Sequence, residues 1–365
     1  MSCKVFLLNI LLLVAGISVT GQVYLPKKAY LHLIGRIDDK VDVTLNLVKI
    51  NDSIYADLVY SESECVHAVL FGKTNPDGSF WMKNPFCDTG MVFNGNFVTR
   101  QKLSGTYTNS TKGNGQQPFV FVESYPAGSI PLQVFYQDAV KPLVSKPGSP
   151  LAEIKQCMII PGESSNPVIS DTLRELILRD FSDRSMSGSD PDHILQVLQG
   201  AFFDNYFTSN TSLYETFPDA GILNWELLKF MHLLYNDNNL LTYYILSYAY
   251  TGGAHGLETQ NFTVVDISSG KAISLSDFFQ PGFETKLTSI LTQKLKQMNE
   301  LPQSSRLSEH GFFVDEVKPN QNFYVTGRGI GFYYNHYEIA PYANGPTDIF
   351  LPFGEIKELV KKTRF

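Results

Sequence analysis

A histidine set among glycines is the first residue of the chain whose type and setting could do chemistry. His255 lies in the segment 251–256, which reads TGGAHG, and glycine lets the backbone turn and approach a ligand closely. A general base also needs an orienting carboxylate and a nucleophile or activated water within hydrogen-bond reach. Because no nucleophile elbow or metal-type spacing surrounds His255, we assign no catalytic residue and expect a turn histidine bonded to backbone carbonyls.

A second cluster of candidate residues lies in the segment 337–345, which reads YEIAPYANG. Tyr337, Pro341 and Tyr342 favour an aromatic platform for a sugar ring or a protein partner, because tyrosine combines a large apolar face with a polar tip. A structural corner stiffened by Pro341 is the alternative, and both can hold at once. The candidate ligand-binding residues are therefore Gly253, His255, Tyr337, Glu338 and Tyr342.

Metal chemistry has less support. His336 and Glu338 alternate on a predicted strand and would project to one face, which is half of a zinc site. The other histidines stand alone, without HExxH-like or paired Cys/His spacing. We predict no metal and no other cofactor, and we expect tyrosine or backbone amides to neutralise Glu338. The glycine string at 327–331 has no strand-loop-helix setting and predicts a tight turn.

The N-terminal residues have the form of a secretory signal. Lys4 precedes an apolar run at 5–15, and small residues follow up to Gly21, which predicts cleavage before Gln22. The run is shorter than the roughly 20 residues that span a bilayer, although an uncleaved anchor is the alternative. We therefore expect a signal peptide at 1–21 and an exported protein, periplasmic or extracellular, with no membrane span after cleavage.

Three cysteines follow the predicted cleavage site. Export favours disulfides, and Cys65 and Cys87 both lie in the strand-rich N-terminal part, so they form the most plausible pair. Cys157 would then be a buried free thiol, since no basic group lies near it in sequence to lower its pKa. An odd count also leaves an intermolecular bridge open.

Composition and charge exclude some partners. Aromatic residues make up 13% and charged residues 18% of the chain, which indicates a folded protein rather than a disordered one. The formal charge is −7 and no basic run is present, so nucleic-acid partners are excluded because their binding depends on clustered Lys and Arg. A weakly acidic surface would suit a basic protein partner such as lysozyme.

The pattern along the chain predicts an α+β protein whose first part is all β. From 22 to 125, period-two alternation with short turns predicts an antiparallel meander, as an open sheet or a small barrel. A barrel interior could hold a ligand, whereas a solid sheet face packed on the next domain is the alternative. A linker with a short strand at 132–136 is expected over 126–146.

The second part, 147–365, mixes strands and helices. A strand is expected at 154–160, helices at 166–181 and from 190 towards 207, and a hairpin of two long strands at 225–235 and 240–250. Further strands are expected near 260–266, 312, 322, 330 and 348–352, with helices at 283–298 and from 354. These elements predict a C-terminal antiparallel sheet with packed helices.

Several of these segments together resemble a known domain. The hairpin, the TGGAHG turn, Asp266 with 270–271, the run ISLSDFF at 273–279, the strand at 329–332 and the segment 337–345 follow in the order of the DUF3298 domain. A DUF4163-like region at 147–250 would precede a DUF3298-like domain at 251–365. The resemblance implies an envelope protein similar to the lysozyme-sensing module of an anti-sigma factor and to the non-catalytic region of a peptidoglycan deacetylase.

These observations lead to three hypotheses on function. The first is an exported, non-enzymatic envelope protein that binds a cell-wall glycan, such as a peptidoglycan fragment, or a lysozyme-like protein around His255 and the segment 337–342. The second is a cell-wall hydrolase that uses His255 with Glu338 or Asp266, which requires those side chains to converge. The third is a structural or assembly module with an exposed apolar patch.

Overall fold

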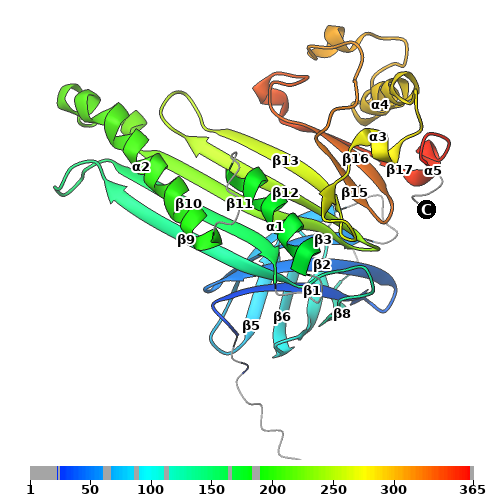
Figure 1. The fold of residues 1–365 in the computed structure, drawn as a ribbon, viewed down its shortest axis with the longest axis horizontal. Coiled ribbons are helices and arrows are strands. Elements are labelled where there is room, and N and C mark those ends of the chain that lie inside the picture. Colours follow the sequence, from blue (N-terminus) through cyan, green and yellow to red (C-terminus); the bar gives the residue numbers. More distant parts are fainter. Residues whose placement is uncertain are drawn as a thin grey trace, which may run out of the picture.

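The computed structural model describes residues 23, 25–60, 67–85, 90–110, 115–162, 167–182 and 190–361. The predicted signal peptide at 1–21 and the proposed Cys65–Cys87 disulfide lie outside these residues. Three assemblies follow one another along the chain: a closed barrel, a six-stranded sheet and a three-stranded sheet (Figure 1). The α+β class and its all-β first part are therefore confirmed.

The N-terminal assembly is an antiparallel barrel in which each strand pairs with the next and β1 pairs with β8. Alternation of apolar and polar residues, with turns as short as two residues, produces this meander. Of the two forms expected from the sequence, the closed one is present. Its strands are β1 (Lys28–Ile37), β2 (Val41–Ile50), β3 (Ser53–Tyr60), β4 (His67–Thr74), β5 (Ser79–Lys83), β6 (Val92–Thr99), β7 (Lys102–Thr108) and β8 (Gln117–Glu123).

Side chains fill the interior of the barrel. Phe93, Phe119 and Phe121 are almost completely buried there, and their rings lie within 6.1 Å of one another. A hollow of about 550 Å³ lies at one mouth of the barrel, where the Lys49 amine donates to the carbonyl of Pro26 at 3.0 Å. The barrel interior is thus a packed core.

The central assembly is a six-stranded sheet in the order β14-β13-β12-β11-β10-β9. The predicted linker is wrong in its extent, because its short strand is an eleven-residue strand of this sheet. The β12–β13 hairpin also continues the sheet across the predicted boundary at 250–251. Its strands are β9 (Leu132–Pro142), β10 (Leu151–Pro161), β11 (Trp225–Asp237), β12 (Leu240–Tyr250), β13 (Leu257–Asp266) and β14 (Lys271–Ala272).

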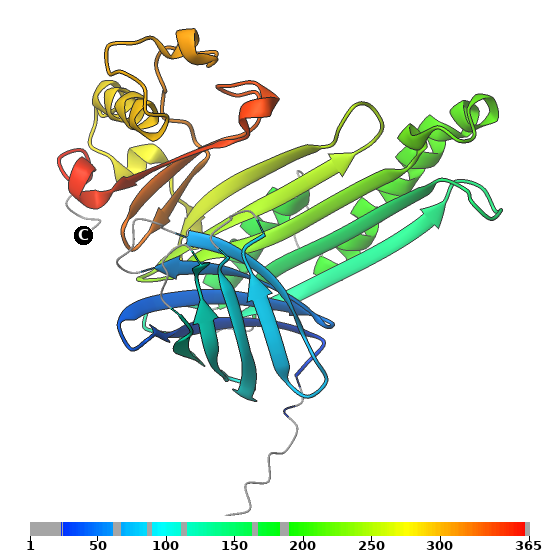
Figure 2. The same cartoon turned by 180° about the vertical axis from the view of Figure 1, so that it is seen from behind.

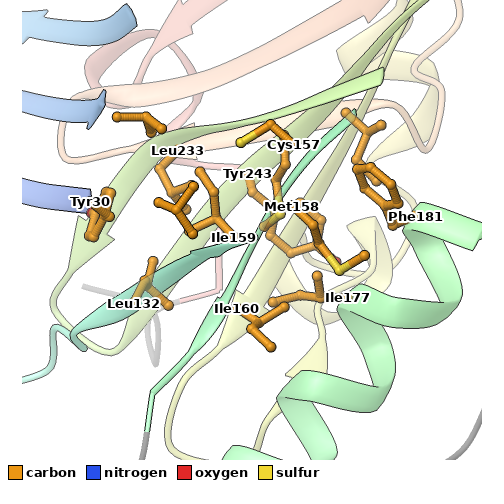
Figure 3. Close-up of a cluster of buried hydrophobic side chains, with 14 of the residues drawn as sticks. Tyr30, Leu132, Cys157, Met158, Ile159, Ile160, Ile177, Phe181, Leu233 and Tyr243 are labelled. Atoms are coloured by element: carbon orange, nitrogen blue, oxygen red, sulfur yellow. The ribbon is translucent and has the colours of Figure 1, made fainter. Parts of the chain in front are cut away.

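Two helices cover one face of this sheet, while the barrel packs against the other face at one end (Figures 1 and 2). They are α1 (Pro167–Ser182), close to the bounds expected from helical spacing of apolar residues, and α2 (Pro191–Thr216), which begins where expected but continues well past its expected end near Phe207. Because both helices cross over between β10 and β11, these two strands run parallel, unlike the other pairs. Figure 3 shows the core beside α1, where Ile177 and Phe181 face the apolar strand β10.

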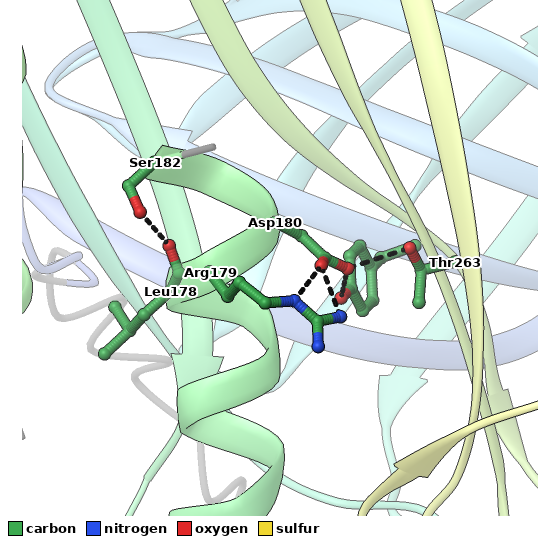
Figure 4. A network of polar contacts seen from close by, with 6 residues as sticks. Leu178, Arg179, Asp180, Ser182 and Thr263 are labelled. Atoms are coloured by element: carbon green, nitrogen blue, oxygen red, sulfur yellow. Dashed lines mark hydrogen bonds and ion pairs between the residues drawn. The ribbon is translucent and has the colours of Figure 1, made fainter. Parts of the chain in front are cut away.

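A partly buried carboxylate fastens α1 to the sheet. Asp180 accepts hydrogen bonds from the hydroxyls of Tyr243 at 2.7 Å and Thr263 at 3.0 Å, and Arg179 pairs with its other oxygen at 2.9 Å (Figure 4). Burial, together with the nearby Asp180 charge, holds the pKa of Tyr243 well above its usual range. Both oxygens of Asp180 are paired within the chain, so this network holds α1 against the sheet.

The C-terminal assembly packs α4 and short helices against a small sheet. Strand β17 is an edge strand of this sheet. Gly327 lies in the turn between β15 and β16, whereas Gly329 and Gly331 belong to β16, so the turn predicted for this glycine string is confirmed only at its first glycine. No helix in the described residues is long and apolar enough to cross a membrane. The elements are α3 (Leu275–Phe278), α4 (Glu284–Met298), β15 (Phe323–Thr326), β16 (Gly329–Tyr334), β17 (Thr347–Pro352) and α5 (Phe353–Ile356), with short 3-10 turns at 221–223, 307–310 and 342–344.

A polar network joins the barrel to the sheet. Asp57 on β3 accepts hydrogen bonds from the His232 ring on β11 and the Tyr244 hydroxyl on β12, each at 3.0 Å. These three side chains are at most 2% exposed. Beside them, Asn46 of β2 accepts from the Tyr30 hydroxyl at 2.9 Å. Every partner is satisfied, so the two assemblies form one continuous buried interface.

Candidate functional site

The turn that carries His255 joins β12 to β13. Gly252 and Gly253 have φ values of +91° and +104°, a backbone region that residues other than glycine rarely adopt. The Tyr250 hydroxyl donates to the carbonyl of Gly253 at 3.1 Å and closes the turn. His255 is exposed at its end, and its Nδ1 lies 2.8 Å from the Gly256 carbonyl oxygen. This is the turn histidine expected from the sequence.

Two asparagines bring the 335–345 segment against this hairpin. Asn322 accepts from the backbone N–H of Phe262 at 2.7 Å and donates to the carbonyl of Gln260 at 2.8 Å. Asn335 accepts from the N–H of Gln260 at 2.7 Å. These amides take the place of a neighbouring strand along the edge of β13, which would otherwise offer unpaired backbone groups. They therefore set the position of the residues that follow Asn335.

The segment places three aromatic rings in one stack. The ring of Tyr342 lies 4.0 Å from that of His255 and 4.3 Å from that of His336, both stacked, so that Tyr342 sits between two histidines. Its hydroxyl donates to the Gly256 carbonyl at 3.2 Å. Tyr337 lies 5.7 Å from Tyr342 and is 51% exposed. Of the predicted site residues, His255, Tyr337 and Tyr342 are thus brought together.

Two further tyrosines belong to this surface and were not among the predicted residues. Tyr248 packs so closely on Gly256 that a Cβ there would lie 2.4 Å from its ring. Burial, followed by the charges of Glu226 and the neighbouring Tyr342 and Tyr250, raises the pKa of Tyr248. Tyr248 and Tyr250 alternate along β12 as residues of any ordinary strand do. Only their contact with a loop far along the chain shows that they belong to this surface. We call the set Tyr248, Tyr250, His255, His336, Tyr337 and Tyr342 the tyrosine–histidine surface.

The predicted strand at 336–338 is wrong. Strand β16 ends at Tyr334, and residues 336–338 form a turn in which Tyr337 has a φ of 68°. His336 and Glu338 therefore do not alternate on a strand face. Glu338 instead accepts hydrogen bonds from the side-chain amides of Asn320 and Asn335, each at 3.4 Å. The sequence had led us to expect a tyrosine or backbone amides as its donors. Within the described ranges no three His, Cys, Asp or Glu side chains are grouped as metal ligands would be.

The groups required by a hydrolase do not all converge. Asp266 ends β13, whereas His255 lies two residues before its first residue, Leu257, so the two lie at opposite ends of a ten-residue strand. The Asp266 carboxylate accepts from the N–H of Ser268 at 2.9 Å within its own turn. The side chains around His255 are therefore aromatic and do not form a general acid–base pair.

Comparison with known proteins places this surface partly within a recognised segment. Residues 276–354 match the family model described as "Protein of unknown function (DUF3298)". That segment holds His336, Tyr337 and Tyr342, whereas His255 and the β12–β13 turn precede it. No curated protein matches the chain.

A solved structure supports the likeness to DUF3298 at the level of the fold. A DUF3298 family member from Bacteroides fragilis is 23% identical with a TM-score of 0.60, covering 64% of this chain and 95% of its own. A DUF3298 family protein from Pseudomonas aeruginosa is 19% identical with a TM-score of 0.47, covering 65% and 96%. At such identity the first similarity shows a shared fold.

Proposed function

We propose that the chain is a non-enzymatic recognition protein of the bacterial cell envelope, and that its tyrosine–histidine surface binds a basic protein partner. The observation that carries this proposal is the stack of Tyr342 between His255 and His336, with Tyr337 exposed beside it. Two loops from distant parts of the chain combine to build it. Rigid aromatic side chains that are half-exposed in this way are typical anchors of protein interfaces.

The composition of the two loops favours a protein partner. The segments 251–256 and 335–346 are rich in glycine, tyrosine and asparagine, the residues that also dominate binding loops of antibodies because tyrosine gives large contact area at little entropic cost. Tyr337 is held in left-handed backbone, which costs about 1 kcal/mol or more for a residue with a side chain. Such strain at an exposed aromatic residue is common at binding sites.

The charge around the surface favours a basic partner. Glu226 lies opposite Tyr250 and Glu258 lies opposite Tyr248 in the strand register, and Glu338 follows Tyr337 directly. Tyrosine faces also attract ammonium and guanidinium groups. With a chain charge of −7, these carboxylates would steer a cationic protein towards the surface.

The wider setting agrees with this proposal. The signal-like residues 1–21 support export to the periplasm or beyond, and the resemblance of 147–250 to DUF4163 and of 251–365 to DUF3298 supports kinship with envelope modules that sense lysozyme or accompany a peptidoglycan deacetylase. We therefore propose a lysozyme-like protein as the partner. A cell-wall glycan at the same surface is the alternative outcome of the test.

The test is a binding measurement on residues 22–365, with hen lysozyme and soluble peptidoglycan fragments as the two probes. Lysozyme should bind saturably, and Tyr337→Ala and Tyr342→Ala should each weaken binding about tenfold or more, the size expected for an interface anchor. Raising the salt concentration to well above about 0.15 M should weaken the interaction, because exposed charges are then screened.

The matched control is Phe71→Ala, which removes an aromatic side chain of 36% exposure from the barrel. It should leave lysozyme binding unchanged. Equal binding by the wild type, Tyr337→Ala and Tyr342→Ala, with all three folded by circular dichroism, would exclude this surface. Saturable binding of peptidoglycan fragments that Tyr342→Ala weakens, without binding of lysozyme, would replace the protein partner at this surface by a glycan.

A further inference from the structure

The barrel carries a hollow on the face turned away from the six-stranded sheet. It encloses about 500 Å³ over β5, β6 and β7, a size within the range of small-molecule sites. Outward positions of these strands meet across the register: Trp81 lies opposite Asn94, and Asn94 lies opposite Thr106. The hollow is lined by Asn75, Ser79, Phe80, Trp81, Asn94, Gly95, Asn96, Gly105 and Thr106.

Paired glycines form the floor of the hollow. Gly95 and Gly105 lie opposite each other in β6 and β7, and a Cβ on Gly105 would stand 2.1 Å from the carbonyl oxygen of Asn94 and 2.5 Å from the Cα of Gly95. The two strands can approach this closely only because both residues lack side chains. A Cβ on Gly95 would lie 3.1 Å from the rings of Phe80 and Phe119 in the barrel core, so the missing side chains face inward. On the outer side, the hollow lies over the closely spaced backbone of these two strands.

The lining selects a class of ligand. None of its nine residues is charged, whereas the tyrosine–histidine surface is bordered by glutamates. Trp81 is 37% exposed, and the side chains of Asn94, Asn96 and Thr106 make no hydrogen bond within the described part of the chain. A flat indole next to uncharged amides and hydroxyls matches a sugar ring, which has an apolar C–H face and an edge of neutral hydroxyl groups.

We propose that this hollow is a binding site for a neutral saccharide, with one sugar ring stacked on Trp81 and its hydroxyl groups hydrogen-bonded to Asn94, Asn96 and Thr106. The Lys83 amine lies over the indole ring, 5.8 Å from its centre, so the sugar is proposed to stack on the opposite face of the ring. The site is separate from the tyrosine–histidine surface, so it stands whether or not that surface binds a protein. Together the two would make the chain an adaptor between wall glycan and a partner.

The chain offers a direct reporter, because it contains two tryptophans. Trp225 is 7% exposed, and its indole N–H has no hydrogen-bond partner in the described residues. Trp225→Phe therefore keeps an aromatic side chain in the core, removes a donor that has no partner among the described residues and leaves Trp81 as the only tryptophan, which can be excited selectively over tyrosine. Titration of this variant with the trimer of N-acetylglucosamine and with cellotriose should give a saturable change in Trp81 emission for at least one of them.

Calorimetry with the sugar that binds then locates the site. Trp81→Ala should weaken binding about tenfold or more through loss of the stacking face, and Asn94→Ala and Asn96→Ala should each weaken it several-fold. Phe71→Ala is the matched control, because Phe71 is 36% exposed on the neighbouring strand but does not line the hollow. It should bind as the wild type does.

Two results would overturn the proposal. One is the absence of any saturable signal with these sugars when the variant is folded by circular dichroism. The other is sugar binding that Trp81→Ala leaves intact, in particular binding that Tyr342→Ala weakens instead, which would place the saccharide on the tyrosine–histidine surface. Lysozyme binding is measured separately and is expected to be the same in Trp81→Ala as in the wild type.

Discussion

The barrel presents two faces to its surroundings, and they are built from similar residues but differ in what covers them. On β1–β3 the outward side chains include Tyr30, Asn46, Tyr55 and Asp57, and all four are buried against the sheet. On β5–β7 the outward side chains include Trp81 and several asparagines, serines and threonines, and Trp81 is 37% exposed. Both faces mix aromatic and uncharged or polar groups in period-two alternation.

The difference between the two faces is whether the partner belongs to the same chain. Asp57 has two donors within 3.0 Å, and the Tyr55 hydroxyl donates to the carbonyl of Met231 at 3.1 Å. A polar group can be buried only when it is paired in this way. The asparagines of β6 have no such partner among the described residues, so their hydrogen-bonding capacity remains available to a ligand.

We call the β1–β3 side of the barrel, which packs on the sheet, the docked face, and the β5–β7 side the free face. Removal of Asp57 from the docked face should give the largest loss of stability among the variants considered. Asp57→Ala would leave His232 and Tyr244, both at most 2% exposed, without their acceptor in a dry interface. Loss of one partner in a buried charged network costs about 3 kcal/mol or more. Urea unfolding should show this loss, with separate unfolding of barrel and sheet where the wild type gives one transition.

Asn94→Ala on the free face is the matched control for Asp57→Ala. It removes a polar side chain from the same barrel, but one that is exposed and unpaired, so the free energy of unfolding should change by no more than about 0.5 kcal/mol. A loss of similar size in both variants would contradict the distinction between a docked face and a free face.

Gly256→Ala should separate stability from recognition on the tyrosine–histidine surface. The new Cβ would stand 2.4 Å from the ring of Tyr248, so the ring must move away and take its neighbours Tyr342 and Tyr250 with it. We expect lysozyme binding to weaken several-fold, while unfolding free energy falls by about 1 kcal/mol, as for a strained surface change. Unchanged binding would remove Tyr248 from the site.

Local pattern predicted much of this fold, and non-local pairing accounts for what it missed. The hairpin 225–250 and helices α1, α2 and α4 follow from periodicity and turn residues. The parallel pairing of β10 with β11 depends on a helical crossover, and closure of β1 on β8 joins strands about 80 residues apart, so neither is visible in any short window.

The candidate site was predicted in part for the same reason. His255, Tyr337 and Tyr342 stand in turns whose glycine and proline attract notice, and the structure brings them together. Tyr248 lies within a regular strand and gives no local signal. His336 and Glu338 were expected to alternate on a strand, but the Asn335 side chain accepts a hydrogen bond from the edge of β13 and the chain turns there. The Trp81 hollow likewise requires three strands in register.

A smaller effect is expected at Asp348, whose carboxylate takes its hydrogen bonds from one hydroxyl group. The Tyr324 hydroxyl lies 2.9 Å from both of its oxygens, and burial raises the pKa of Asp348 above its ordinary value. The folded protein thus holds this proton more tightly than the unfolded chain does, so the contribution to stability is complete below the unfolded pKa and is lost as pH rises through the folded pKa.

Asp348→Asn removes this titration. Its unfolding free energy should vary less with pH than that of the wild type across the acidic interval just above the ordinary pKa of aspartate, about 3.9. Thermal unfolding at a series of acidic pH values would measure the difference. Identical slopes for the variant and the wild type would show that Asp348 titrates alike in the folded and unfolded chain.

The reactivity of Cys157 tests the docked face without any substitution of the cysteine and is the smallest effect that we predict. Its thiol is free and buried, as the sequence predicted, and the Tyr55 hydroxyl of the barrel lies 3.2 Å from its sulfur. Burial raises its pKa to about 12, and only the thiolate reacts readily with alkylating agents. At pH 8 mass spectrometry should therefore find the Cys157 peptide unlabelled by iodoacetamide in the native protein and labelled after denaturation. Faster labelling in Asp57→Ala, whose interface lacks its central acceptor, would show that the barrel lifts from the sheet as a unit, whereas equal rates would mean that Cys157 is protected by the sheet and α1 alone.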